Sequence, residues 1–524
     1  MYSCPGCGSQ MLFDIPSQQL KCGRCDRTMS IEEADEREAR QAGSSFAVDV
    51  LTCPTCGAEI RAVNTAAASF CSYCGSSVML EKQEGAEFVP PETVFPFRIT
   101  REQCFEKFQG MLKGSFCADH RLKKHITAES FRGIYVPYHT YEGAVEGSAT
   151  IEGSETKGDT TYYYKTRVSL NHHYTGIMHD ASKEMPDNIS EAISISHDAR
   201  GLVRAFSPAY LSGFYADVSD TDPDYYIPYA QSETIRKGLE DTLPALKEDS
   251  CSYSMSAAEK ALMPKTQATY TGDTMLPVWF MSMKSGKRVL YAVQNAVTGE
   301  MWADIPMDTS RFALVTLLIA AALFFAFNSF LTLRPEMVMI AAMLLAFFAQ
   351  IAVNCRRAKI QEQKMAEAVV RGETVDVTDR LAKMKKLAAR VKRQQNGGTF
   401  RYIGVLAAAV ASCVGLSVLS AIDNVRIYRY GALILTVIMA VAIIPWEKRP
   451  RLPFGCLMTF AAMLAGTAIM LLDPFHSADT PVYIVTLAIM AGVIWECLSL
   501  LSLYNKSCSN PLPQFESHVG GEML

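Results

Sequence analysis

The sequence lacks the short motifs that mark common ATP-driven and hydrolytic enzymes. It has no G-x-x-x-x-G-K-[ST] loop, so a P-loop helicase or ATPase motor is excluded. It also lacks the HExxH and GxSxG patterns and a Cys-His signature of the nucleophilic enzyme families. We therefore predict that the chain is not an enzyme, with no catalytic residue and no small-molecule substrate.

A secretory signal is also missing, because Met1–Gly8 contains no apolar run of the kind that such a signal needs. We expect the N-terminal half to stay in the reducing cytosol. In that compartment the sixteen cysteines are expected to be metal ligands or free thiols and not disulfides.

Basic residues are scarce in the first part of the chain. Residues 1–310 hold 29 Lys and Arg against 41 Asp and Glu, a net charge of −12, whereas the remainder has 21 against 13, a net of +8. Affinity for nucleic acid depends mainly on Lys and Arg that neutralise phosphates. The charge distribution therefore makes nucleic acid an unlikely partner of the soluble half.

Cysteine pairs of the CxxC type are present twice over, with fourteen residues between the pairs of each quartet. The first quartet is Cys4, Cys7, Cys22 and Cys25, and the second is Cys53, Cys56, Cys71 and Cys74. Two CxxC turns can close a tetrahedral shell of four thiolates around one Zn²⁺ at about 2.3 Å. We predict two structural Zn²⁺ ions, because four protein sulfurs leave no open position for a substrate or a water.

A thioredoxin-like redox role expects one CxxC pair beside a βαβ unit. Four pairs in two matched quartets argue against that role here. Gly8, Gly57 and Gly75 follow three of the four pairs and suit the positive φ of a knuckle turn. Asp26 takes the glycine place at the fourth pair, where we expect slight backbone strain.

The pattern of elements predicts a multidomain fold, with zinc ribbons at 1–30 and 51–80 and a charged helical linker at 31–50. Within this linker the helical charge pattern covers Ile31–Gln41. Residues 88–308 are predicted to form an α+β cytoplasmic domain. Its expected helices are Thr100–Leu112 and Ser232–Leu246, and its expected strands are Ile134–Tyr141, Thr161–Leu170, Thr274–Met283, Arg288–Asn295 and Met301–Ile305. The aromatic segments Tyr135–His139 and Leu276–Phe280 resemble each other, which suggests a duplicated sheet unit.

The C-terminal part contains six apolar runs of roughly 17–23 residues, each long enough to span about 30 Å of hydrocarbon as a helix. They are Phe312–Leu331, Met337–Asn354, Tyr402–Ile422, Tyr430–Trp446, Leu452–Leu472 and Pro481–Leu503. We predict an α-helical membrane domain of about six spans, with spans 1–2 in 312–354 and spans 3–6 in 401–503. The flanking Lys and Arg residues predict a multi-pass protein of the cell membrane, with the N-terminal half and the tail 504–524 in the cytoplasm.

The predicted loop 355–400 is basic and contains a candidate site for anionic lipid or for an acidic partner. Its candidate residues are Arg380, Lys383, Lys385, Lys386, Arg390, Lys392 and Arg393. Inside the last predicted span, Glu496 is a candidate for proton relay or cation binding, and a helix contact is the alternative.

His172, His173, His179 and Asp180 form the local histidine cluster of the middle domain. Adjacent residues on a strand point to opposite faces, so His172 and His173 do not readily share one metal ion. We interpret these side chains as exposed or capping groups.

The ordered set of ribbons and strand segments resembles a bacterial family of membrane-anchored proteins with TFIIB-type zinc ribbons. The residues that carry the resemblance are the paired ribbons, Val94–Phe97, Gly133–Tyr138 and Leu276–Phe280. Some members are encoded beside phage-shock-type and SPFH-type membrane-stress proteins. The resemblance implies a membrane-bound partner or recruiter of such proteins.

We therefore expect a docking and recruitment scaffold on the cytoplasmic face of the membrane, with protein partners and a role in membrane stress or envelope homeostasis. Two alternatives stay open. One is a membrane-tethered regulator that binds nucleic acid, and the other is a transporter with a regulatory zinc-ribbon head.

Overall fold

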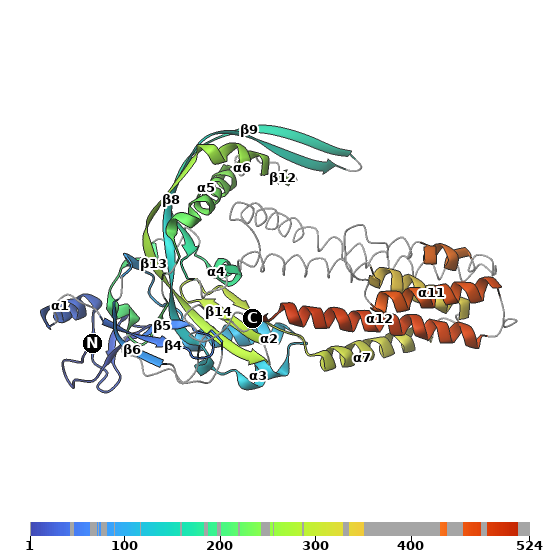
Figure 1. Cartoon of the computed structure of the whole chain (residues 1–524), viewed down its shortest axis with the longest axis horizontal. Helices are drawn as coiled ribbons and strands as arrows, with labels where there is room; N and C mark the ends of the chain where they lie inside the picture. Colours follow the sequence, from blue (N-terminus) through green and yellow to red (C-terminus); the bar gives the residue numbers. More distant parts are fainter. Residues whose placement is uncertain are drawn as a thin grey trace. The chain divides into compact units, whose positions relative to one another are not determined.

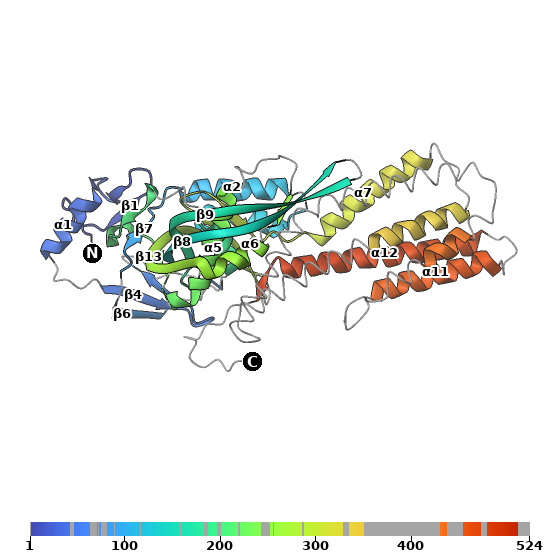
Figure 2. The same cartoon turned by 90° about the horizontal axis from the view of Figure 1, so that it is seen from above.

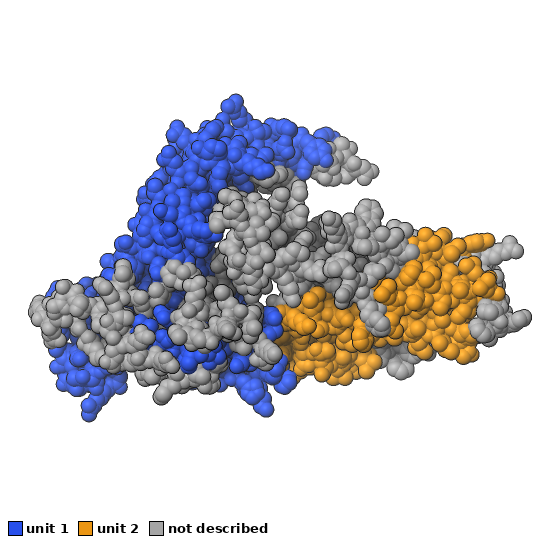
Figure 3. Space-filling model, viewed as in Figure 1, with its two compact units in different colours: residues 1–116, 120–305, 509–524 blue, residues 117–119, 306–508 orange. Residues whose placement is uncertain are grey.

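The structure, a computed structural model, divides the chain into two compact units. Unit 1 comprises residues 1–116, 120–305 and 509–524, and unit 2 comprises residues 117–119 and 306–508 (Figure 3). The structure describes residues 2–41, 47–62, 71, 73–74, 81–87, 90–115, 117–157, 160–182, 187–195, 201–217, 219, 221–242, 252–254, 256–285, 288–328, 335–350, 430–437, 454–472 and 479–511.

Unit 1 begins with a three-stranded antiparallel sheet in the order β1-β2-β3. The strands are β1 (Met11–Asp14), β2 (Gln19–Cys22) and β3 (Thr28–Met29), followed by helix α1 (Ile31–Gln41). Side chains alternate along β1, so Met11 and Phe13 are buried while Leu12 is 42% exposed. Helix α1 has the bounds that the charge pattern predicts.

The large sheet of unit 1 follows the order β10-β7-β13-β8-β11-β5-β4-β6, with β9 and β12 paired to β8, and with β14, β15 and β16 continuing from β13. Its strands are β4 (Ala47–Thr52), β5 (Glu59–Ala62), β6 (Glu81–Glu87), β7 (Thr93–Val94), β8 (Arg132–Lys157), β9 (Thr160–Asp180), β10 (Arg204–Ala205), β11 (Tyr215–Ala216), β12 (Ser252–Ser254), β13 (Thr266–Ser285), β14 (Arg288–Asn295), β15 (Met301–Ala303) and β16 (Asn510–Pro511). Strands β4 and β5, which flank Cys53 and Cys56 of the second quartet, thus belong to the same sheet as the strands of the middle domain.

Two long antiparallel hairpins form the centre of this sheet. The β8–β9 hairpin is paired from Tyr138 opposite Asp180 to Lys157 opposite Thr160, and β13 pairs with both β8 and β14. Figure 2 shows β8, β9 and β13 running side by side. The two similar aromatic segments face each other across the β8–β13 ladder, with Tyr135 opposite Pro277. Their similarity is therefore matched by an antiparallel pairing of the two segments.

Helices cover parts of this sheet. Helix α2 begins with a capping box, in which the Gln103 N–H donates to Thr100 Oγ1 at 3.3 Å and the Thr100 N–H donates to Gln103 Oε1 at 2.9 Å. Helices α5 and α6 lie along one side of the β8–β9 hairpin (Figure 1). The helices of unit 1 after α1 are α2 (Arg101–Gly114), α3 (His120–His125), α4 (Asp187–Ile193), α5 (Ile227–Thr242) and α6 (Ser256–Leu262). The short 3-10 turns are η1 (Ala128–Ser130), η3 (Pro208–Leu211), η4 (Pro223–Tyr226) and η6 (Met263–Lys265).

The main core of unit 1 joins the central strands to the second cysteine quartet. Buried side chains of β8, β13 and β14, among them Val136, Phe280 and Tyr291, pack in one cluster with all four of those cysteines. A separate cluster lies between the β8–β9 hairpin and the two helices α5 and α6.

Unit 2 contains helices α7 (Thr309–Asn328), α11 (Phe454–Leu472) and α12 (Thr480–Ser507). Helices α11 and α12 pack closely where small residues meet. A Cβ atom added to Gly492 of α12 would lie 2.3 Å from Thr459 Oγ1 of α11, which is too close for a larger residue. Met339, Met343 and Ile489 are among the buried residues of this unit. The hydroxyls of Thr436 and Thr467 are 2.7 Å apart.

The prediction of about six membrane spans is wrong. Within the described part of the chain, two helices are long and apolar enough to cross a membrane, Gly455–Leu472 and Thr480–Lys506. Two shorter apolar stretches lie within the described residues, Thr309–Leu318 in the first part of α7 and Pro335–Gln350. The predicted span Tyr402–Ile422 lies outside the described residues, and Tyr430–Trp446 lies mostly outside them.

Candidate metal centres

The first cysteine quartet converges at one point. The Sγ atoms of Cys4, Cys7, Cys22 and Cys25 all lie within 4.8 Å of one another. The Sγ–Sγ distances are 3.5 Å for Cys4 and Cys25, 3.5 Å for Cys7 and Cys22, and 3.6 Å for Cys7 and Cys25. A tetrahedral shell with metal–sulfur bonds of about 2.3 Å has sulfurs about 3.8 Å apart, so the quartet can hold one metal ion.

The second quartet has the same arrangement. Its four Sγ atoms also lie within 4.8 Å of one another. The Sγ–Sγ distance is 3.8 Å for Cys53 and Cys74 and 3.7 Å for Cys56 and Cys71. These values match the edge of a tetrahedral four-sulfur shell, about 3.8 Å. The structure therefore brings together all eight cysteines that the spacing predicts, as two groups that can bind two metal ions.

Knuckle turns position the ligands in both centres. The N–H groups of Gly8, Asp26 and Gly57 donate to the carbonyl oxygens of the first cysteines of their pairs, at 2.8–3.0 Å. Gly8 has φ 71° and Gly57 has φ 81°, while Asp26 has φ 57°. The predicted left-handed backbone at Asp26 is thus confirmed, and Gly75 lies outside the described residues. A non-glycine residue in this region carries a steric cost, which is smaller for Asp than for most residues.

The two centres differ in their exposure to solvent. In the second quartet every cysteine is 0% exposed. In the first quartet Cys4 and Cys22 are buried, Cys7 is half-buried and Cys25 is exposed. The first centre therefore presents sulfur to solvent and the second does not.

Hydrogen bonds tie the second centre into the large sheet. The Tyr73 hydroxyl donates to Asp217 Oδ2 at 2.7 Å, and Ser182 Oγ donates to the same oxygen at 2.5 Å. The Tyr291 hydroxyl of β14 donates to the Tyr73 carbonyl at 2.8 Å. Because Asp217 is 1% exposed, its carboxylate is stabilised by these hydroxyl groups and not by water. The sequence analysis did not identify Tyr73 and Asp217, since nothing in the motif indicates where the knuckle docks.

Among the described residues, the hydrogen bonds that attach the first ribbon come from its hairpin and from α1. The Phe13 N–H donates to the Ser212 carbonyl at 2.9 Å, and Gln18 Nε2 donates to the Phe97 carbonyl at 2.7 Å. Asp35 of α1 accepts from the hydroxyls of Tyr2 at 2.9 Å and Ser207 at 2.8 Å. These contacts hold one side of the ribbon, and the knuckle with Cys25 stays exposed.

Local hydrogen bonds also favour the ligating form of a thiol in the first ribbon. A backbone hydrogen bond from Ser9, assisted by Cys22, lowers the pKa of Cys7 to about 6. A thiolate is the form of cysteine that binds metal. The environment of Cys7 therefore favours its thiolate, whereas hydrogen bonds to the neighbouring sulfurs raise the pKa of Cys25 to about 12.

The predicted histidine cluster does not converge on a metal site. The rings of His179 and Tyr226 stack at 3.7 Å, and those of His172 and Tyr174 at 5.8 Å, whereas His173 Nε2 is 3.9 Å from Glu142 Oε2. Burial lowers the pKa of His179 to about 4. Among the residues that the structure describes, the groups of three or more side chains that can hold a metal ion are the two cysteine quartets.

His139 is a buried histidine that the sequence analysis did not identify. Its Nδ1 is 2.7 Å from Asp273 Oδ1, and its Nε2 is 3.0 Å from Thr221 Oγ1. Tyr270 donates to the same Asp273 oxygen at 2.8 Å. The ring is 1% exposed and both its nitrogens have partners, so His139 joins the loop at Thr221 to strands β8 and β13.

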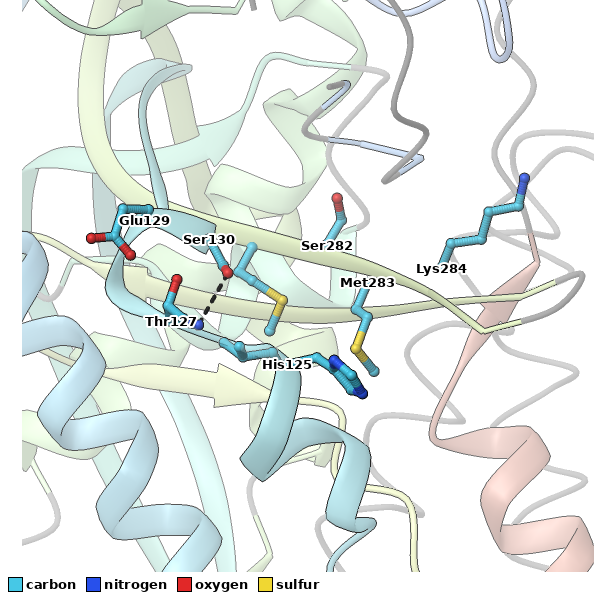
Figure 4. A pocket seen from close by; sticks show the side chains of 9 residues that line it. His125, Thr127, Glu129, Ser130, Ser282, Met283 and Lys284 are labelled. Carbon is cyan, nitrogen blue, oxygen red and sulfur yellow. Dashed lines mark hydrogen bonds between the residues drawn. The ribbon is translucent and has the colours of Figure 1, made fainter. Parts of the chain in front are cut away.

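A shallow pocket of about 390 Å³ lies beside the second centre and is lined by the α3–η1 segment and β13. Figure 4 shows His125, Thr127 and Glu129 on one side and Met283 and Lys284 on the other. Ser282, which also lines the pocket, donates through Oγ to the Cys71 carbonyl at 3.5 Å. The pocket contains none of the predicted site residues.

The remaining candidate residues lie in or near unit 2. The basic residues from Arg380 to Arg393 fall outside the described residues. Glu496 lies on α12 and is 2% exposed. Its side chain packs against Gly455 of α11, because a Cβ atom added to that glycine would lie 2.6 Å from Glu496 Cγ. Gly455 is in the first turn of α11, where a carboxylate interacts favourably with the helix dipole. This position suits the helix contact that was the alternative to a transport role.

The fold and the two centres define a protein with paired four-cysteine metal sites, a large β-sheet unit and two C-terminal helices that can cross a membrane. No family model matches the chain, and no solved structure matches it. The chain is similar to an uncharacterized protein, YdjG, of Bacillus subtilis (strain 168). The two are 24% identical over 325 residues, which is 60% of this chain and 92% of YdjG.

Proposed function

We propose that both centres hold Zn²⁺ and that the protein is a membrane-attached zinc-ribbon scaffold. A closed shell of four thiolates in tetrahedral arrangement is typical of structural Zn²⁺. The spacing of the pairs and the knuckle turns at Gly8, Asp26 and Gly57 support membership of the TFIIB-type ribbon family that the sequence resembles.

The observation that carries the docking role is the display of the first ribbon. Its hairpin is held by Ser212 and Phe97. On the same ribbon Cys25 is exposed, and Leu12, which lies beside Gly213, is still 42% exposed. A small rigid module that presents an apolar side chain and a metal knuckle is suited to binding another protein. In the second ribbon all four cysteines are 0% exposed, so they present no sulfur to solvent.

Membrane attachment in this proposal comes from α11 and α12, whose apolar stretches of 18 and 27 residues are long enough to cross a bilayer. The thiol-rich unit 1 lies on the cytoplasmic side, where thiols stay reduced. The proposed partners are phage-shock-type or SPFH-type membrane-associated proteins, as the resemblance implies. The process is membrane stress or envelope homeostasis.

The first test is the metal content of the full chain purified in detergent. Two zinc ions per chain are expected by elemental analysis. Iron in place of zinc, or fewer than one ion per chain, would contradict the proposed centres.

The second test is capture of partners by the full chain in nanodiscs, compared with a Leu12→Glu variant that keeps both metal ions. Enrichment of coiled-coil or SPFH-type proteins that resists nuclease and is lost in Leu12→Glu supports the scaffold. A matched control is Tyr163→Ser, because Tyr163 is 83% exposed on the distant β9 and should not affect capture. Salt-sensitive recovery of nucleic acid instead would favour the regulator alternative over the scaffold.

A further inference from the structure

We propose that the first ribbon contains an oxidative modification site at Cys25, at which peroxide-class oxidants form a disulfide and release one of the two metal ions. The inference rests on zinc at the two centres, as in the proposed function, but not on the docking role. It assigns different chemistry to two quartets that have the same spacing in the sequence.

Access is the first argument. Cys25 is the exposed ligand of its quartet, and Cys7 beside it is half-buried. The Sγ of Cys25 lies 3.5 Å from that of Cys4 and 3.6 Å from that of Cys7. An oxidant that reaches Cys25 therefore finds a second sulfur within about 1.5 Å of disulfide bonding distance.

The environment of Cys25 is the second argument. Arg24 and Arg27 lie close to Cys25 in the sequence. The Arg27 guanidinium lies beside Gly6 of the other knuckle, since a Cβ atom added to Gly6 would be 3.1 Å from Arg27 Nη1. Reactive cysteines occur in electropositive and partly exposed surroundings, whereas buried structural cysteines are inert. Cys25 has the exposure and, in the sequence, the neighbouring arginines of such a site, whereas the four cysteines of the second quartet are buried.

The reaction balances with hydrogen peroxide as the oxidant. The Cys25 thiolate attacks one peroxide oxygen, the O–O bond breaks and hydroxide leaves, which produces a sulfenic acid. The thiolate of Cys4 or Cys7 then attacks that sulfur, and the hydroxyl group leaves as water after taking up a proton. The hydroxide from the first step takes up a second proton from the solvent. Two thiolates are thus oxidised to one disulfide and one peroxide is reduced to two waters, so the metal ion loses two ligands and dissociates.

The second quartet is protected against the same reaction. All four of its cysteines are 0% exposed, and the cluster around them includes Tyr73, Phe280 and Tyr291. A peroxide molecule has no access to these sulfurs unless the sheet core opens. The difference between the two ribbons is therefore a difference in the rate of oxidation and not in the ligand set.

The experiment uses the full chain in detergent, loaded with two zinc ions, with hydrogen peroxide in excess and a zinc-chelating dye as the readout. We expect one equivalent of zinc to be released at least tenfold faster than the other. Peptide mapping after the fast phase should find Cys25 in a disulfide with Cys4 or Cys7. Release of both ions at the same rate, or a first disulfide within the second quartet, would overturn the proposal.

A variant tests the role of Cys25 itself. Cys25→His keeps four zinc ligands, because histidine replaces cysteine in many structural sites, and it should slow the fast release at least tenfold. Fast release that persists in Cys25→His would also overturn the proposal. A preparation without zinc before oxidation would instead contradict the metal identity in the proposed function, so the two failures are distinguishable. If the Cys25→His variant does not bind zinc at the first centre, the wild-type release rates and the peptide map test the proposal.

Discussion

The two ribbons of this chain have one spacing and two different surroundings. Each has CxxC pairs separated by fourteen residues, and in each the four sulfurs lie within 4.8 Å of one another. Yet the first presents Cys25 to solvent and the second buries all four ligands among strands β8, β13 and β14. The comparison shows that the CxxC motif determines which sulfurs can bind a metal ion. The packing around the motif determines how much of unit 1 depends on that ion for its stability.

In the second ribbon, binding of a metal ion would be linked to the folding of the sheet. Its cysteines share a core with Val136, Phe280 and Tyr291, and its Tyr73 is bonded to Asp217. Binding of a metal to a site that exists only in the folded state adds to the stability of that state. Metal loss there should therefore affect all of unit 1, and metal loss from the first ribbon should remain local.

The largest expected effect comes from removing one ligand at the same motif position in each ribbon. Cys56→Ser should lower the free energy of unfolding of unit 1 by more than about 4 kcal/mol, since it removes a buried metal shell. Cys7→Ser should also lose one metal ion but lower that free energy by less than about 1 kcal/mol. Thermal unfolding of the full chain, followed by near-UV circular dichroism, measures both. Equal destabilisation by the two variants would abolish the distinction between the ribbons.

The next effect is expected from acid, which must be separated from metal loss. Burial lowers the pKa of His179 to about 4, below the value of about 6.5 in an unfolded chain. The unfolded chain therefore takes up a proton first, so stability is complete above pH 6.5 and decreases as pH falls towards 4. The loss should reach about 2–3 kcal/mol.

The measurement is the free energy of unfolding of the full chain across this pH range, with metal content recorded at each point. His179→Gln should abolish the part of the pH dependence that occurs without metal release. Unchanged pH dependence in this variant would assign the whole acid effect to the cysteine ligands.

A third pair of variants tests the docking hydrogen bonds. Tyr73→Phe removes the donor to the buried Asp217, and we expect a cost of about 1–3 kcal/mol because Asp217 is 1% exposed. Tyr2→Phe removes the matching bond to Asp35 in the first ribbon and should cost about 0.5–1.5 kcal/mol. Chemical denaturation of the two variants compares them, and a larger effect from Tyr2→Phe would reverse the order that the structure predicts.

The smallest expected effect concerns the knuckle turn at Asp26. With φ at 57°, Asp26→Gly should relieve steric strain and stabilise the first ribbon by about 0.5–1 kcal/mol. Loss of the exposed Lys21–Asp26 ion pair should offset little of this gain. Metal competition with a chelator should show slightly tighter binding at the first centre, and weaker binding would show that the side chain of Asp26 outweighs its backbone cost.

Much of the local structure could be predicted from the sequence. The helix α1 has the predicted bounds, β14 has the predicted bounds Arg288–Asn295, and the capping box at Thr100 starts α2 one residue after the predicted start. These features depend on neighbours within a few residues, which a sequence pattern records directly. The eight ligands were predictable for the same reason, because the CxxC spacing is itself the geometry of the turn.

The number of membrane helices could not be predicted from hydropathy. An apolar run shows which residues avoid water, but the length of helix that it forms depends on where the chain turns. Within the described part of the chain, Gly455–Leu472 and Thr480–Lys506 are the helices that are long and apolar enough to cross a membrane. The depth of Glu496 beside Gly455 likewise depends on the packing of two helices.

The sequence by itself determined the chemistry of this protein: eight thiols in two quartets, an acidic part in residues 1–310 and apolar C-terminal runs. Only the tertiary structure decided that one quartet is part of a sheet core and the other is exposed. Ligand spacing is a property of a few consecutive residues, whereas burial depends on residues such as Asp217 and Tyr291, which are 144 and 218 positions away from Tyr73. Contacts over such separations are formed by the folded sheet and leave no signature in either motif.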